Sequence, residues 1–244
     1  MRIYQFTKTG DHHVNHCEDY TITETLGTDK ILCAVMDGCT MGTDSYFAST
    51  LTGKLLRKIA IERRFQAFYE KTPSLDCKAE SKEVLRRLMT ELRAIKNLLF
   101  LNSDELLTTL ILGVFDLQKN EGFVLTVGDG LVYANGVYTE YEQNNIPDYI
   151  GYHLSEDFET WFSAQHQVVT VDTLSDISLS TDGIFTFLPY DQGIYNISKD
   201  PVDYLLLDCS DEDMANMLLK KTTFLEQHCG LRPTDDLGII RLRW

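Results

Sequence analysis

Proline, long apolar runs and basic charge are all scarce in this sequence of 244 residues. Only five prolines occur, and no Pro/Gly-rich linker, internal repeat or low-complexity tract divides the chain, so we expect a single domain over residues 1–244. No apolar run approaches the roughly 20 residues of a membrane helix, so we expect no membrane partner. The opening MRIYQFTKTG alternates like a strand and lacks the apolar segment of a signal peptide, so we expect a cytoplasmic protein.

Cysteine pairs of the CxxC type are absent, and a chain of this length does not need disulfides to build a core. We therefore expect the six cysteines to be reduced. Cys33 and Cys209 lie in apolar surroundings and are expected to be small buried side chains. Cys39 lies two residues after Asp37, where a packing role and a redox-sensitive thiol are both open alternatives.

Basic residues are outnumbered, with 22 Lys and Arg against 37 Asp and Glu and a formal net charge of −15. This balance argues against contact with the phosphate backbone of nucleic acids, so we expect no nucleic-acid partner. The imbalance is concentrated in residues 101–200, which hold sixteen acidic side chains and two basic ones. An acidic half of this kind serves solubility and also permits a cation site.

Apolar periodicity predicts a layered α+β protein and not alternating βαβ units. Apolar residues recur every four positions from Phe47 to Ile59, which is typical of a helix that covers a sheet. Gly230 is expected to end the last helix, and the aromatic region 142–167 is expected to be irregular. Helices are expected over about 43–68, 84–99 and 211–228. Strands are expected at 2–8, 19–26 and 31–36, within 106–117, 122–141 and 173–187, and at 235–244.

Carboxylates recur at the ends of these predicted strands. Asp37 follows the apolar run ILCAVM, Asp129 precedes the final glycine of VLTVGDG, Asp182 precedes that of ISLSTDG, and Asp235 stands at the edge of the last strand. Asp-Gly is also a turn signal, so any one of these acids taken alone indicates only a turn. Antiparallel strands packed in layers can bring such ends to one rim, where carboxylates cannot all stay ionised unless a cation neutralises them.

Oxygen ligands of this kind suit Mg²⁺ or Mn²⁺ and not Zn²⁺. The sequence has no Walker A loop, no GxSxG motif and no HExxH motif. Two close cations held by carboxylates can ionise a bridging water near neutral pH and neutralise the charge that develops on a phosphoryl group. Phosphoester hydrolysis is therefore the reaction that these residues favour.

Six motifs follow one another along the chain: CEDY (17–20), VMDGCTMG (35–42), LTTLILGVF (107–115), VGDGLVY (127–133), LSTDGIF (179–185) and TDDLGII (234–240). In type and order they resemble the signature motifs of the PP2C (PPM) family of metal-dependent Ser/Thr protein phosphatases, from about residue 10 to the last residue. The resemblance implies a four-layer αββα sandwich, in which two antiparallel sheets are flanked by helices. It also implies hydrolysis of phosphoserine or phosphothreonine in proteins by direct attack of a metal-activated water.

The resemblance further implies a site with two Mn²⁺ or Mg²⁺ ions. Asp37 would bridge the two ions, and the Gly38 carbonyl would ligate one of them. Asp182 and Asp235 would hold the other ion, which Glu18 would contact through water.

Other residues would support this site. Asp19 would orient the ligands by hydrogen bonding. Asp129, with Asp182, would match the weaker third-metal site of the family, and the alternative for Asp129 is a hairpin-turn aspartate. Thr108 and Thr109 match a small-residue motif on a central strand, where we expect a packing role.

The sequence departs from the family at Val14, where many members carry an arginine that binds the substrate phosphate. Weaker phosphate binding and replacement by another cation are both open, and His12 and His13 are the candidate replacements. The alternative for either histidine is a solvated or packed loop residue. A phosphoprotein is the expected substrate, and a monomer is the expected state. Two other functions stay open: a catalytically silent module that binds or senses a partner, and a phosphatase of a small phosphorylated metabolite.

Overall fold

The structure, a computed structural model, describes residues 1–13, 15–40, 42, 44–70, 74–143, 147–190 and 198–244. Within these ranges, two five-stranded antiparallel sheets have the strand orders β1-β12-β9-β6-β7 and β2-β3-β4-β5-β8, and β10 pairs with β11. The strands are β1 (Arg2–Lys8), β2 (Tyr20–Leu26), β3 (Lys30–Met36), β4 (Leu110–Asp116), β5 (Glu121–Val127), β6 (Gly130–Ala134), β7 (Val137–Tyr141), β8 (Val168–Val171), β9 (Asp176–Ser180), β10 (Phe187–Pro189), β11 (Leu231–Pro233) and β12 (Leu237–Arg243).

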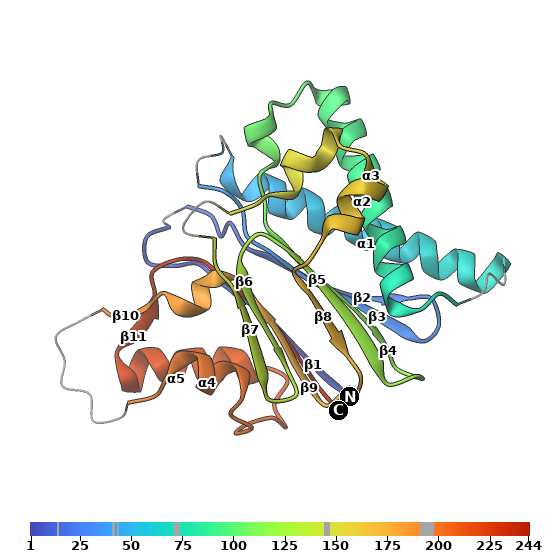
Figure 1. Cartoon of the computed structure of the whole chain (residues 1–244). Helices are drawn as coiled ribbons and strands as arrows, with labels where there is room; N and C mark the ends of the chain where they lie inside the picture. The colour runs from blue at the N-terminus through green and yellow to red at the C-terminus, as the bar shows by residue number, and fades with distance from the viewer. Residues whose placement is uncertain (14, 41, 43, 71–73, 144–146, 191–197) are drawn as a thin grey trace.

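The helices lie in two groups on opposite sides of the strands. In Figure 1, α1, α2 and α3 gather at the upper right, whereas α4 and α5 lie at the lower left. The α-helices are α1 (Ser45–Glu70), α2 (Cys77–Leu99), α3 (Phe158–Ala164), α4 (Pro201–Leu206) and α5 (Met217–Cys229). Short 3-10 helices cover Ser103–Leu106, Ile150–Ser155 and Asp182–Phe185.

Strand β3 shows how the layers are filled. All seven of its residues are buried, and alternate side chains of a strand point to opposite faces. The odd-numbered side chains from Ile31 to Val35 pack between the two sheets. The even-numbered ones from Leu32 to Met36 pack toward α1 and α2. A strand buried on both faces reads as a continuous apolar run, which is the pattern of ILCAVM.

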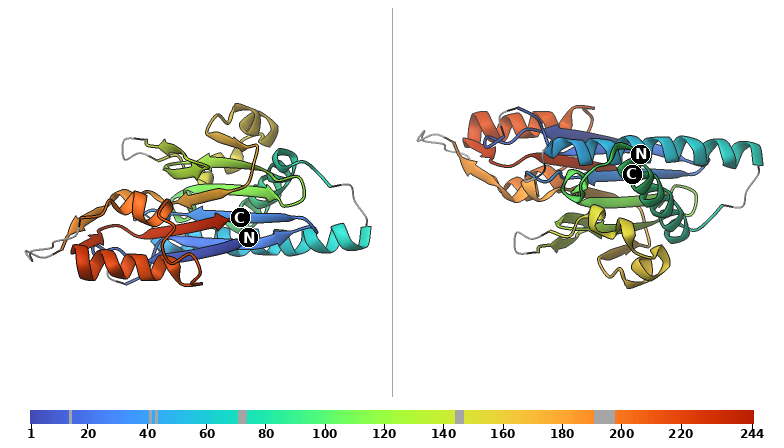
Figure 2. Two further views of the ribbon diagram at one scale, coloured as in Figure 1. Left: turned by 90° about the horizontal axis from the view of Figure 1, so that it is seen from below. Right: turned by 90° about the horizontal axis from the view of Figure 1, so that it is seen from above.

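The other sheet is covered by the second group of helices. Ile240 of β12 belongs to the cluster between the sheets, whereas Ile239 packs with Leu205 of α4 and Leu218 of α5. The layers are therefore helices, sheet, sheet and helices, which confirms the predicted αββα sandwich. Strand β1 pairs with β12 from Arg2 opposite Arg243 onward, so the first and last residues lie side by side, as Figure 2 shows.

Three expectations about local structure need correction. The helix expected over 211–228 begins only at Met217, and Asp211 has a left-handed backbone (φ 63°) that does not fit a helix. The described part of region 142–167 contains two short helices, Ile150–Ser155 and α3, and Trp161 of α3 is buried in the core beneath α2. Cys33 is buried as expected, but Cys209 is exposed; all six cysteines lie in the described ranges and are free.

Two further points concern individual ranges. Helix α1 begins at Ser45 among the described residues; its expected start at residue 43, like the phosphate-binding position at Val14, lies outside them. Among the described helices, none combines the length and apolar character that crossing a membrane requires.

Candidate functional site

The Asp37 backbone is held by two threonines of the neighbouring strand end. The Asp37 N–H donates to Thr109 Oγ1 (3.1 Å), and the Thr109 N–H donates to the Asp37 carbonyl (2.9 Å). Thr108 Oγ1 donates to the same carbonyl (2.7 Å). The pairing of β3 with β4 thus continues beyond the regular strands and fixes where Asp37 leaves the sheet.

Position 38 requires glycine because the backbone carbonyl groups of two other segments lie very close to its Cα atom. A Cβ atom built on Gly38 would lie 2.1 Å from the Ser45 carbonyl oxygen and 3.1 Å from that of Glu18, too close for any side chain. The Gly38 N–H donates to the Glu18 carbonyl (3.2 Å), and Ser49 of α1 donates its hydroxyl to the same oxygen. The entry of β2, the exit of β3 and the start of α1 therefore meet at Glu18.

Strand pairing brings three further acids to one end of the other sheet. Strand β9 pairs with both β12 and β6, and Ser180 lies opposite a residue of each. Asp182 follows β9, Asp235 precedes β12 and Asp129 precedes β6. Because these three strand ends are neighbours, the acids share one edge of the sheet.

Asp19 connects the two sheets. It is buried, and its Oδ2 accepts a hydrogen bond from Thr181 Oγ1 (2.6 Å) at the end of β9. Its Oδ1 is buried without a hydrogen-bond partner of normal geometry among the described residues. Burial raises the pKa of Asp19 to about 8, although the hydrogen bond from Thr181 acts in the opposite direction.

The pKa shifts of these acids follow from burial and from one another's charges. Burial, followed by the charges of Asp19, Asp182 and Asp235, raises the pKa of Asp37 well above its usual range. Burial and the charges of Asp129 and Asp235 raise the pKa of Asp182 to about 7. Burial and the charge of Asp235 also raise the pKa of Asp129. Each of these acids is therefore harder to ionise in the folded protein than in water.

The donor set fits a hard divalent cation in chemistry and charge. Every member offers carboxylate oxygen, the ligand that Mg²⁺ and Mn²⁺ prefer, and the unpartnered Oδ1 of Asp19 leaves an acceptor unused. Over the ranges that the structure describes, no group of three or more His, Cys, Asp or Glu side chains is arranged to hold a metal ion as it stands. The fit is therefore one of donor type and charge, and not of preformed coordination geometry.

The loop before β2 is fastened to this site by Asp236. Asp236 is buried, and its carboxylate accepts hydrogen bonds from the backbone N–H of Gly10 (2.7 Å) and of Glu18. His13 Nδ1 lies 2.8 Å from Asp236, and its Nε2 lies 3.5 Å from Asp235. Burial lowers the pKa of His13, but the hydrogen bond to Asp236 and the nearby acids outweigh this, and the net pKa is raised.

The two candidate phosphate contacts differ in position. His13 is mostly covered and lies against the acids, whereas His12 is exposed and its N–H donates to the Thr234 carbonyl (2.9 Å). Both line a pocket of about 370 Å³, which also has Glu18 and His16 in its walls. The histidines thus lie beside the acid cluster, in a pocket that is open to a ligand.

Four positions were given too little weight by the sequence. Thr108 and Thr109 were expected to pack, yet they hydrogen-bond the Asp37 backbone. Thr181 precedes an Asp-Gly pair and binds Asp19. Asp236, beside Asp235 in the last motif, organises the N-terminal loop. In the sequence, each of these four residues is a polar residue next to the apolar run of a predicted strand, and this feature could have identified them.

Comparison with known proteins agrees with this architecture. The family Protein phosphatase 2C matches residues 9–221. The chain is similar to the structure of a bacterial serine phosphatase that carries a point mutation, with TM-score 0.63 and 15% identity over 99% of this chain and 97% of that one. It is also similar to the serine/threonine phosphatase of S. agalactiae, with TM-score 0.61 and 13% identity over 99% and 98% of the two chains.

A third similar structure is the PP2C phosphatase domain, with a fragment of the regulatory domain, of SpoIIE from Bacillus subtilis. Its TM-score is 0.55 and its identity 19%, over 99% of this chain and 63% of that one. No curated protein matches the sequence significantly. At such identities the solved structures establish the shared fold alone.

The family match covers residues 9–221, and the likeness in fold covers 99% of the chain. The fold is that of PP2C-type phosphatases. This chain belongs to the protein phosphatase 2C family.

Proposed function

We propose that this protein is a divalent-metal-dependent phosphatase that removes phosphate from phosphoserine or phosphothreonine in proteins. The observation that carries the proposal is that strand pairing brings Asp129, Asp182 and Asp235 to one edge of one sheet, and that Asp19 of the other sheet hydrogen-bonds Thr181 beside them. Such a concentration of buried negative charge costs stability unless a cation neutralises it. Membership of the family supports the same conclusion, and we propose one phosphatase domain over residues 1–244.

Named residues of this chain would hold the metal ions. Asp37 would bridge two Mn²⁺ or Mg²⁺ ions with the Gly38 carbonyl on one, and Asp182 and Asp235 would hold the other. Glu18, which is buried and accepts a hydrogen bond from Thr40 Oγ1 (3.1 Å), would contact an ion through water. When bound, such ions supply an acidified water as nucleophile and neutralise the charge on the phosphoryl group.

The protein's own groups then orient the ligands and the substrate. Asp19, fixed by Thr181, would orient the carboxylates around it. His13, a cation when protonated, would attract the substrate phosphate at the edge of the pocket. Asp129 would complete a third, weaker ion site with Asp182. These roles are inferred from position and charge, and each can be tested by mutating the residue.

The direct test is hydrolysis of a phosphoserine peptide and of p-nitrophenyl phosphate with added Mn²⁺ or Mg²⁺, compared with excess EDTA. We expect turnover only with the divalent ion, and a loss of at least about 100-fold in Asp182→Asn. Asp172→Asn is the matched control, because Asp172 is an exposed aspartate in the turn before β9. Equal activity in EDTA, or an unaffected Asp182→Asn variant, contradicts the proposal.

A catalytically silent binding module is a second candidate, and one observation favours it: within the described residues the acids are not grouped into a ready coordination site. Calorimetric titration with Mn²⁺ separates the two, since a silent module needs no tight divalent site. Rates on a phosphopeptide and on sugar phosphates, measured side by side, distinguish a protein substrate from a small metabolite.

A further inference from the structure

Tyr149 lies beside the acid cluster and has no role in the function proposed above. Its side chain is 8% exposed and packs with Cys39 and Leu107 in a small cluster separate from the main cores. Cys39 follows the Asp37-Gly38 pair, and Leu107 precedes Thr108. The phenol thus touches both segments that fix the position of Asp37.

The backbone next to Tyr149 is tied to the same segments. The Ile150 N–H donates to the Thr108 carbonyl (3.2 Å), and Thr108 Oγ1 donates to the Asp37 carbonyl (2.7 Å). Burial and the charges of Asp37 and Asp129 raise the pKa of the Tyr149 hydroxyl.

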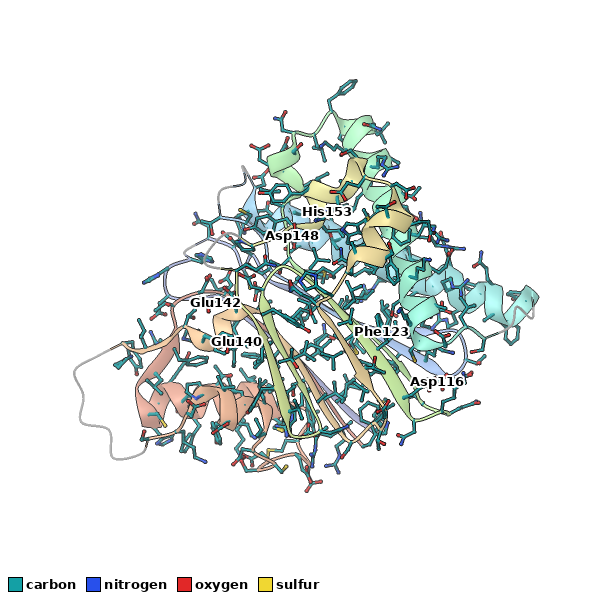
Figure 3. The ribbon with its side chains drawn as sticks, viewed as in Figure 1. Asp116, Phe123, Glu140, Glu142, Asp148 and His153 are labelled. Atoms are coloured by element: carbon teal, nitrogen blue, oxygen red, sulfur yellow. The ribbon has the colours of Figure 1, made fainter. Side chains whose placement is uncertain are left out.

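A histidine bridge holds this segment in place. His153 Nε2 lies 2.8 Å from both carboxylate oxygens of Asp148, and its Nδ1 lies 2.8 Å from Glu156 Oε1. Asp148 and His153 lie next to each other in Figure 3. The ring also stacks at a tilt on Trp161 of α3, with centroids 5.6 Å apart. The bridge joins the residue before Tyr149 to the core beneath α2.

We propose that Tyr149 is a positioning residue of the phosphatase site, and that the His153 bridge holds it there. Its ring packs against Cys39 and Leu107 and so restrains both segments that hold the Asp37 backbone at the end of β3. This inference rests on the proposed phosphatase function. It concerns a residue outside the six motifs, on the segment between β7 and α3.

The kinetic test is Tyr149→Ala, which removes the ring that packs on Cys39 and Leu107. We expect kcat on a phosphoserine peptide with Mn²⁺ to fall about 10-fold, with KM unchanged, since the packing beside the Asp37 backbone is lost. Tyr152→Ala is the matched control: Tyr152 contacts Tyr149 edge-on at 5.5 Å, but 51% of it is exposed, and we expect wild-type kinetics. Wild-type kcat in Tyr149→Ala, or an equal loss in Tyr152→Ala, overturns the proposal.

A second readout does not depend on activity. Cys39 is 5% exposed, and the proposed contact predicts that its thiol reacts slowly with a maleimide, as followed by peptide mass mapping. Tyr149→Ala should speed this reaction at least about 10-fold, and His153→Gln should speed it to a smaller extent, while Cys33 between the sheets stays unreactive. Unchanged Cys39 labelling in both variants refutes the contact. If Cys39 labelling changes as expected but the wild-type protein shows no Mn²⁺-dependent turnover, the contact stands and only the proposed phosphatase function is refuted.

Discussion

Neutralising one acid of the cluster should stabilise the metal-free protein, and Asp182→Asn is the sharpest case. The pKa of Asp182 is raised from 3.8 to about 7 by burial and by the charges of Asp129 and Asp235. A rise of this size corresponds to about 4 kcal/mol at a pH where the group is ionised in both the folded and unfolded states. Because Asp182 is only partly buried, solvent screening reduces the expected effect to about 2 kcal/mol.

The sign depends on pH. The folded protein holds the Asp182 proton more tightly than the unfolded chain, so the cost of ionisation is absent below the unfolded pKa of 3.8 and grows as pH rises through about 7. Asp182→Asn removes this cost. The stabilisation should therefore be near zero at about pH 4, and it should reach its full value of about 2 kcal/mol at about pH 8.

The assay is urea unfolding in EDTA at both pH values, with Asp172→Asn as the surface control. Saturating Mn²⁺ should reverse the order, because the wild type gains binding energy that the variant lacks. If Asp182→Asn is no more stable than the wild type at the higher pH in EDTA, the acids do not repel one another, and the electrostatic argument for the site fails.

The remaining predictions concern the supports of the site. Gly38→Ala should cost at least about 2 kcal/mol of stability and abolish activity, since a Cβ there would lie 2.1 Å from a backbone oxygen of α1; thermal unfolding checks this. Thr108→Val removes the hydroxyl that binds the Asp37 carbonyl, and we expect about a 10-fold lower kcat with an unchanged circular dichroism spectrum. The pKa of His13 is raised by its contact with Asp236 despite burial, so its stabilising effect is present at low pH and lost as pH rises through the folded pKa. Thermal melts of His13→Gln should accordingly fall below the wild type near pH 6 and converge with it near pH 9; a constant difference would rule out the charged contact.

Local patterns in the sequence predict much of the secondary structure. The apolar run ILCAVM predicts a strand buried on both faces, and β3 is such a strand. The four-residue periodicity from Phe47 predicts the helix that became α1. These predictions succeed because side-chain periodicity and turn chemistry act between residues close in sequence. Where a local backbone feature intervened, as at Asp211 before α5, the same reasoning failed.

The sequence by itself determined which residue types end each strand, and hence that acids of one chemical kind recur beside Gly38 and Gly183. Only the tertiary structure decided which of them meet. Thr181 reaches Asp19 across 162 positions of sequence, Asp236 fastens Gly10 across 226, and Tyr149 comes to rest on Cys39. These contacts depend on the order of strands in two sheets and on how the sheets stack. That arrangement is set by burial of the whole core, and no single segment encodes it.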